Sequence, residues 1–201
     1  AEALVGLAPA IALLLSDSDP YVRQLVMEVL GKLPAGALVA LEPPIAQRLS
    51  DSDLDVRQSS VAVLGKLPAE ALAAQAPAIA QRLDHWDWSV RQSAVEVLGK
   101  LPAEALAALV PAISQRLNDS DLDVRQSAVV VLGKLPAGAL VAQAPAIVQR
   151  LEDEDWSVSR STVDVLGKLP ADDLVAQAPA IAQRLEHEYA YVRQSAVEVL
   201  G

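Results

Sequence analysis

The chain has 201 residues, a net charge of -10 and no cysteine. A chain this acidic repels phosphate, which argues against nucleic-acid binding through a basic groove and against a polybasic membrane anchor. The absence of cysteine excludes a disulfide framework and a thiolate zinc site. No apolar run is long enough to insert into a membrane, and residues 1–15 lack the basic start of a signal peptide.

One 34-residue motif is repeated along the whole chain. Val-Arg-Gln recurs at this step from Val22, with Val-Ser-Arg in its place at Val158, and Leu-Gly-Lys-Leu-Pro recurs from Leu30. No insertion or linker interrupts the period, which is the signature of a repeat architecture. We therefore predict a single repeat domain over residues 1–201, made of six repeats: 1–34, 35–68, 69–102, 103–136, 137–170 and 171–201.

The first half of each repeat predicts a helix that contains a proline. In the third repeat the apolar residues follow spacings of four, three and four, at Leu72, Ala76, Ile79 and Leu83. These spacings place them on one helical stripe. Pro77 lies inside this pattern, so we expect a kink or a break into two short helices.

The second half of each repeat predicts a second helix with its own apolar stripe. Asp87 occupies the N-cap position, and Gly99 with Lys100 marks the end of the helix. The same pattern predicts second helices over residues 20–32, 54–66, 88–100, 122–134, 156–168 and 190–200. One hairpin cannot bury its stripes alone, so we predict an all-α fold, a right-handed α-solenoid (superhelix) of six stacked helical hairpins.

Residues 45–67, IAQRLSDSDLDVRQSSVAVLGKL, resemble a HEAT repeat. The shared features are the proline in the first helix, the Asp in the turn and the Val-Arg at the start of the second helix. The resemblance covers the whole chain and is closest to the short HEAT-like variety also found in phycobilin lyases. It implies a ladder between neighbouring repeats, formed here by Asp19/Arg23, Asp53/Arg57, Asp87/Arg91 and Asp121/Arg125.

A spacing of four residues places each of these pairs on one helical face. The pattern lapses twice, because Ser159 replaces Arg in the fifth repeat and Tyr189 replaces Asp in the sixth. The ladder is expected to be weakest there.

The sequence offers no candidate catalytic, cofactor-binding or metal-binding residue. The Asp-Ser-Asp-Leu-Asp stretches resemble the start of a calcium loop, but they lack its sixth-position Gly and twelfth-position Glu, and helix caps explain them better. His85 and His187 lie on separate turns and cannot share a metal. Near-identical repeats also argue against an enzyme, because catalysis needs different groups that converge on one point.

All six aromatic residues lie at the turn between the two helices of a repeat: Tyr21, Trp86, Trp88, Trp156, Tyr189 and Tyr191. Trp88 and Trp156 share a position that is apolar in every repeat, so we expect their rings to pack between adjacent turns. Trp86 occupies a position that is otherwise Ser or Glu, where nothing in the repeat plan requires a ring. We therefore expect Trp86 to be a binding anchor, with Tyr21 and Tyr191 as weaker candidates. Trp88, Trp156 and Tyr189 lie on the same edge and are also candidate partner-binding residues.

The first repeat is more apolar than the others. Leu13, Leu14 and Leu25 stand where most other repeats have Gln, Arg and Ser. A terminal repeat normally becomes more polar. This difference suggests a missing upstream segment, a partner subunit or end-to-end self-association through the first repeat.

The main functional hypothesis is a non-enzymatic scaffold that binds a protein partner along the turn edge and the concave helix face. Four alternatives stay open: a structural spacer subunit of a large assembly, a bilin-lyase-like component, an engineered consensus array, and a fragment of a longer array. In each case the partner is a protein or a larger complex, with no nucleic acid and no membrane insertion. The sequence does not identify the partner or the compartment.

Overall fold

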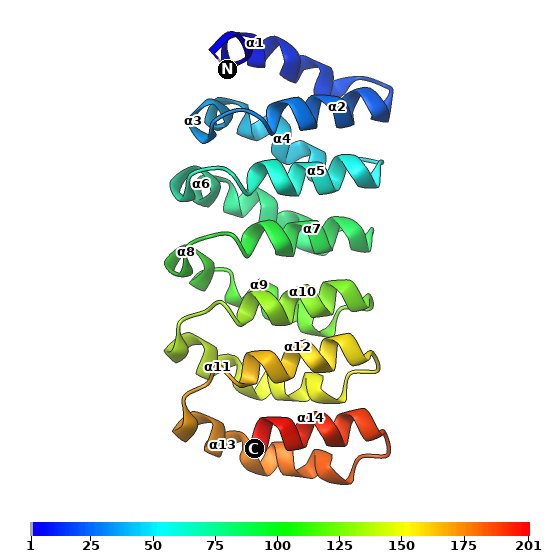
Figure 1. Ribbon diagram of the computed structural model, residues 1–201, viewed down its shortest axis with the longest axis vertical. Helices are drawn as coiled ribbons and strands as arrows, with labels where there is room; N and C mark the ends of the chain where they lie inside the picture. The colour runs from blue at the N-terminus through cyan, green and yellow to red at the C-terminus, as the bar shows by residue number, and fades with distance from the viewer. Residues whose placement is uncertain (1) are drawn as a thin grey trace. The chain divides into compact units, whose positions relative to one another are not determined.

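A computed structural model describes residues 2–201, with side chains from residue 4 onward. These residues form two compact parts, which we call the first half, up to Pro102, and the second half, from Ala103 to Gly201. Each half contains three of the predicted repeats, and each repeat is a helical hairpin (Figure 1). Residues 2–201 contain helices and no strand, which confirms the all-α prediction. The single domain over residues 1–201 stays a prediction.

The second helices of the repeats begin where the sequence predicts. They are α2 (Pro20–Leu30), α5 (Leu54–Leu64), α7 (Trp88–Leu98), α10 (Leu122–Leu132), α12 (Trp156–Leu166) and α14 (Ala190–Leu200). The side chains of Asp19, Asp53, Asp87, Asp121 and Asp155 accept backbone N–H groups of the first turn, so the predicted N-caps are confirmed. The first five helices end two residues earlier than predicted, because the chain turns at the Gly-Lys pair.

The first helices follow two patterns. Four are continuous through their proline: α1 (Glu2–Ala12), α6 (Ala69–Ala80), α11 (Ala137–Val148) and α13 (Ala171–Gln183). In the second and fourth repeats the helix is broken, into α3 (Ala35–Leu38), η2 (Val39–Leu41) and α4 (Glu42–Gln47), and into α8 (Ala103–Ala107) and α9 (Val110–Gln115). The first helix is therefore broken in these two repeats, as expected from its proline, whereas α6 continues through Pro77.

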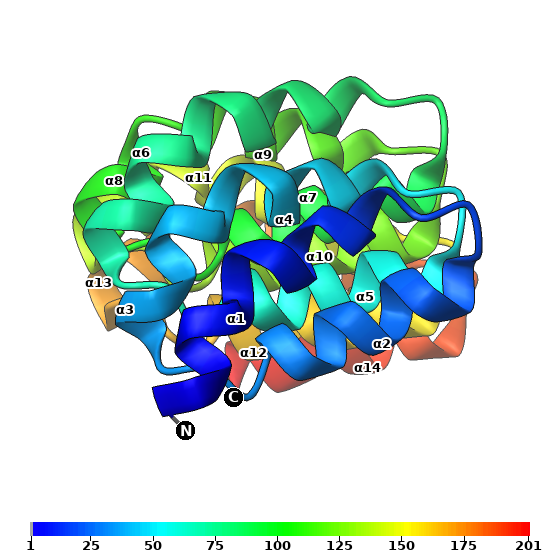
Figure 2. The same ribbon diagram turned by 90° about the horizontal axis from the view of Figure 1, so that it is seen from above.

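A short 3-10 segment follows each first helix and leads into the turn. These segments are η1 (Leu13–Ser16), η3 (Arg48–Ser50), η4 (Gln81–Asp84), η5 (Arg116–Asn118), η6 (Gln149–Glu152) and η7 (Arg184–Glu186). Figure 2 shows how η1 and the turn join α1 to α2, which lie side by side as the two arms of the first hairpin. The core consists of aliphatic side chains between the first and second helices of each repeat.

A glycine ends each of the first five second helices, and at Gly133 it allows a close approach to the next repeat. It has right-handed helical dihedrals at Gly31, Gly65, Gly99, Gly133 and Gly167, and no glycine among the described residues has a positive φ. A Cβ at Gly133 would lie 2.5 Å from Cγ2 of Val165 in the next repeat.

The lysine after this glycine links a repeat to the one before it. Lys100 Nζ donates to the carbonyl of Val61 at 3.1 Å, Lys168 Nζ donates to that of Gly133 at 3.3 Å, and Lys66 Nζ donates to that of Gly31. A cation at these C-terminal carbonyls is also favoured by the helix dipole.

Gly133→Ala is expected to lower the free energy of unfolding by about 1–3 kcal/mol, because the new methyl group overpacks against Val165. Gly138→Ala in α11 is the matched control, since a Cβ there has open space. It should be neutral or stabilising by up to about 1 kcal/mol, because alanine loses less entropy in a helix. Urea unfolding of both variants checks the difference, and equal midpoints would contradict the packing role of Gly133.

Candidate functional site

The turns between the two helices of each repeat form the candidate site, which we call the turn edge. They comprise residues 17–19, 51–53 and 85–87 in the first half and residues 119–121, 153–155 and 187–189 in the second half. In each turn the first side chain accepts the backbone N–H two residues later, as Asp51 does from Asp53 at 3.0 Å. His85 and His187 do the same through Nδ1, at 3.1 and 3.2 Å.

A buried ion pair joins neighbouring repeats at this edge. Arg23 Nε and Nη2 donate to the two carboxylate oxygens of Asp51 at 2.9 and 2.5 Å, and Arg125 binds Asp153 in the same way at 2.9 and 2.8 Å. Each arginine also donates through Nη1 to carbonyls of the turn before its own helix. Each arginine therefore ties its own turn to the turn of the next repeat.

The pairing expected four residues apart is wrong for Asp19/Arg23, Asp53/Arg57, Asp87/Arg91 and Asp121/Arg125. The carboxylates of these pairs cap the helices, so they bond to backbone N–H groups. In the ion pairs that form, the arginine binds an Asp of the next repeat. This Asp lies two residues before the N-cap residue of that repeat. That position is Asp in repeats 1, 2, 4 and 5 and His in repeats 3 and 6, a difference that the sequence already contains.

The ladder is interrupted at one place that the sequence predicted and at one that it did not. In the fifth repeat the hydroxyl of Ser159 meets that of Ser195 at 3.0 Å in place of an ion pair. In the first half, Arg57 faces a turn that carries His85 instead of Asp. Its Nη2 lies 3.8 Å from Asp87, and its Nε is buried without a hydrogen-bond partner.

The tryptophan side chains keep large exposed faces at the turn edge. Trp86 is 86% exposed, Trp156 60% and Trp88 41%. The Trp86 ring lies next to that of His85, with centroids 5.4 Å apart, and Arg91 Nη1 holds the turn by donating to the carbonyls of His85 and Trp86. Trp86 is therefore carried on a fixed turn and is open to solvent.

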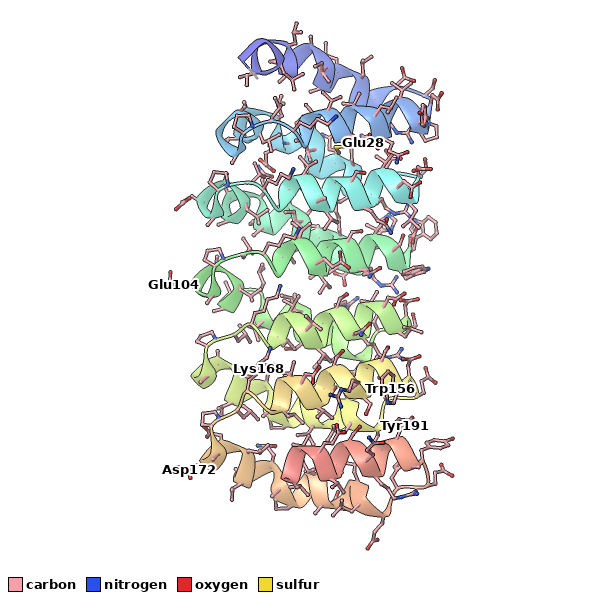
Figure 3. The ribbon with its side chains drawn as sticks, viewed as in Figure 1. Glu28, Glu104, Trp156, Lys168, Asp172 and Tyr191 are labelled. Carbon is pink, nitrogen blue, oxygen red and sulfur yellow. The ribbon has the colours of Figure 1, made fainter. Side chains whose placement is uncertain are left out.

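The tyrosines differ in their contacts. Tyr21 and Tyr189 are exposed, and Tyr189 stacks on Tyr191 with ring centroids 5.8 Å apart. Tyr191 is half-buried, and its hydroxyl donates to the carbonyl of Asp153 at 2.8 Å, which links the sixth repeat to the fifth. Burial, with nearby Tyr189 and carboxylates, raises the pKa of Tyr191. Figure 3 shows Tyr191 and Trp156 at the same edge of the second half.

A groove runs between α5 and α7 on the second-helix face of the first half. It has a volume of about 250 Å³. Leu54 and Ser89 line its turn end, next to Trp88 at the start of α7, and Lys100 lines its other end. Its remaining walls are Gln58, Val61, Ala62, Gln92, Ser93 and Glu96. The groove therefore combines an apolar wall with amides, a carboxylate and, at one end, the cation of Lys100.

A second hollow, of about 670 Å³, lies at the turn edge of the second half. Arginines and carboxylates line it together: Arg125, Arg150, Arg184, Asp119, Glu152, Asp153 and Glu154. Arg184 Nη2 pairs with Glu152 at 2.7 Å, and Nε of both Arg150 and Arg184 is buried without a hydrogen-bond partner. These charges compensate one another, so the hollow is not a basic pocket.

The three leucines that distinguish the first repeat are all exposed: Leu13, Leu14 and Leu25.

Within residues 2–201, no three His, Asp or Glu side chains lie together in a way that could hold a metal ion. In the same part of the chain, no helix is both long and apolar enough to cross a membrane.

Comparisons with known proteins agree with the repeat geometry. The HEAT repeat family matches residues 7–76, 76–144 and 110–201. Similar solved structures include an engineered protein (19% identity, 96% of this chain and 94% of that chain, TM-score 0.64). A designed armadillo repeat protein in complex with the peptide (KR)4 is also similar (17% identity, 96% and 97% covered, TM-score 0.63). The comparison with curated proteins gave no match.

These structural neighbours confirm the predicted solenoid fold, and the sequence matches confirm the resemblance that the proline, Asp and Val-Arg pattern indicated. The matched segments together cover nearly all of the chain. The chain belongs to the HEAT repeat family.

Proposed function

We propose that the chain is a non-enzymatic scaffold that binds an extended, positively charged segment of a partner protein. The binding surface is the turn edge together with the face of the second helices. The observation that carries this proposal is the groove between α5 and α7, which at one end reaches Ser89, directly after the turn that carries the exposed Trp86 and Trp88. HEAT-like repeats commonly use such extended surfaces for binding.

The chemistry of the groove suits a lysine or arginine side chain. Its methylene stem can lie along Leu54 and Ala62 while its charged head reaches Glu96. The net charge of -10 favours the approach of a cationic segment. A structural neighbour, the designed armadillo repeat protein, was solved with the basic peptide (KR)4, which supports this class of ligand.

Trp86 supplies the second part of the proposed surface. A flat, exposed indole on the turn that precedes α7 can stack on a guanidinium or cover an apolar side chain of the partner. Because repeats 1, 2 and 4 have Ser at the same position, the fold does not require a ring there. The ring therefore serves binding better than packing.

Trp86→Ser is expected to weaken binding of a fluorescein-labelled Lys-Arg octapeptide by about tenfold to thirtyfold, or about 2 kcal/mol, as for a hot-spot residue. Its free energy of unfolding should change by less than about 0.5 kcal/mol, as for a surface position. Fluorescence anisotropy at low and high salt measures the affinity, and binding should weaken with salt. Trp88→Ala, in contrast, should mainly lower stability.

The control variant is Val175→Ala, which trims an exposed apolar side chain on the first helix α13, outside the proposed surface, and should leave peptide binding unchanged. No binding of the peptide, or equal affinity of the Trp86→Ser variant and the unchanged chain, would contradict the proposed surface. A large loss of stability in Trp86→Ser would place the ring in the packing instead.

A further inference from the structure

Two positions of the repeat contact the preceding repeat in several of the later repeats, and both positions are leucine in the first repeat. At one of them, Arg82 donates to Ser50 Oγ at 3.1 Å, Arg150 donates to the carbonyl of Leu117 at 3.0 Å, and Arg184 pairs with Glu152. The first repeat has the exposed Leu14 at this position. Leu14 therefore lies on the face that elsewhere meets the preceding repeat.

Leu25 lies on the same face of the first repeat. Its counterpart Ser161 accepts a hydrogen bond from Gln126 of the preceding repeat at 3.2 Å, and its counterpart Ser195 meets Ser159. Leu7 extends the patch, because it is 58% exposed whereas its counterpart Leu41 is 6% exposed. The first repeat thus presents an apolar patch where a preceding repeat would stack.

The first repeat also carries the charged groups that pair with a preceding repeat. Asp17 is the counterpart of Asp51 and Asp153, the carboxylates that receive an arginine from the repeat before them. Lys32 is the counterpart of the lysines that donate to carbonyls of the preceding repeat. Asp17 accepts the N–H of Asp19, as the other turn carboxylates do, and is half-exposed.

The last repeat presents the complementary groups. Arg193 is the counterpart of Arg23 and Arg125, but it is exposed and has no carboxylate partner within residues 2–201. Val197 is 58% exposed, although its counterparts Val61, Val95 and Val129 are buried. This face therefore has an unpaired guanidinium next to an apolar patch.

We propose that copies of this chain associate head to tail, with the last repeat of one copy docked on the first repeat of the next. In this arrangement Arg193 binds Asp17 of the next copy as Arg23 binds Asp51, and Val197 covers part of the Leu7, Leu14 and Leu25 patch. The occupant is a second copy because each end carries the half of the ladder that the other lacks. The contact joins two different surfaces, so it propagates instead of closing into a dimer. This proposal is independent of the peptide-binding surface.

Charge reversal tests the contact directly. Sedimentation equilibrium of the unchanged chain should show a mass that keeps rising with concentration beyond that of a dimer. Arg193→Asp alone and Asp17→Arg alone should each weaken association by at least about tenfold, because each brings like charges together. Mixing the two variants should restore association, since each junction between different variants joins an arginine to an aspartate.

A second variant covers the case in which Asp17→Arg disturbs its turn. Leu14→Glu with Leu25→Glu places two charges in the apolar patch and should also weaken association, while circular dichroism shows an unchanged helix content. A chain that stays monomeric at all concentrations would overturn the proposal. A closed dimer that is insensitive to Arg193→Asp would overturn it as well, since that result indicates a symmetric contact through the leucines alone.

Discussion

Asp51→Ala is expected to lower the free energy of unfolding by about 3–5 kcal/mol, because it leaves the guanidinium of Arg23 buried without its partner. Both side chains are more than nine-tenths buried, and Arg23 holds both carboxylate oxygens. Arg48 lies 3.2 Å from the same carboxylate, so a second arginine also loses a partner. Urea unfolding at neutral pH measures the loss.

Asp53→Ala is the matched control, two residues further along the same turn. Asp53 caps α5 through two backbone N–H groups, so its loss should cost about 1 kcal/mol. Asp51→His, which installs the residue of repeats 3 and 6, should keep the hydrogen bond within the turn but lose the ion pair. Equal costs for Asp51→Ala and Asp53→Ala would show that the ion pair between repeats contributes no more than a helix cap.

The stabilisation by the Arg23–Asp51 ion pair should depend on pH, because the pKa of Asp51 differs between the folded and unfolded states. Burial alone would raise its pKa, but hydrogen bonds from Arg23 and the Asp53 N–H, with the charges of Arg23 and Arg48, lower it below its usual value. Because the folded-state pKa is depressed, the stabilisation is present above the unfolded-state pKa, about 4. It is lost as the pH falls through the folded-state pKa.

Glu42→Val is expected to raise the free energy of unfolding by about 1–3 kcal/mol at neutral pH, because it removes a poorly partnered carboxyl from the interior. Glu42 is 5% exposed at the start of α4, and its Oε1 has no hydrogen-bond partner. The equivalent residue is Ala or Val in the other repeats, with Val110 in the fourth, where the first helix is broken in a similar way. Thermal unfolding of the two chains measures the gain.

The gain should depend on pH in the direction opposite to that of Asp51. Burial raises the pKa of Glu42, and a hydrogen bond with Gln75 only partly offsets this. Ionisation of the carboxyl therefore adds no cost below its unfolded-state pKa, about 4, and the added cost grows as the pH rises from there to the folded-state pKa. The stabilisation by Glu42→Val should be largest at neutral pH and small at pH 4. The exposed Glu104 provides a control, since Glu104→Val should show no such gain.

The helices of this chain follow from local sequence, whereas the contacts between repeats do not. Asp19 and its counterparts mark helix starts because an N-cap is a property of a few neighbouring residues. The partner of Arg23 lies 28 residues away, and the four-residue spacing to Asp19 pointed to the wrong carboxylate. Aligning the repeats would have exposed the alternative, since only the position of Asp51 alternates between Asp and His.

Burial was predictable where a position has the same character in every repeat. Leu30 and its counterparts in the next four repeats are fully buried, as their shared apolar character implied. Glu42 was not foreseen, because one charged residue in an apolar column can point inward or outward and the sequence alone does not choose. The exposure of Trp86 agrees with its polar column, while its role in binding stays a proposal.

Because the ladder is interrupted at its junction with the fifth repeat, the sixth repeat should have the lowest free energy of local unfolding in the second half. Its junction to the fifth repeat has a pair of hydroxyls, Ser159 and Ser195, where the fourth and fifth repeats share a buried ion pair. Its first helix, α13, buries only Ile181, whereas α11 buries four residues. Local unfolding free energies follow such differences in buried contacts. Amide exchange and proteolysis would therefore begin at this repeat, and cooperative unfolding of the second half would involve the fourth and fifth repeats.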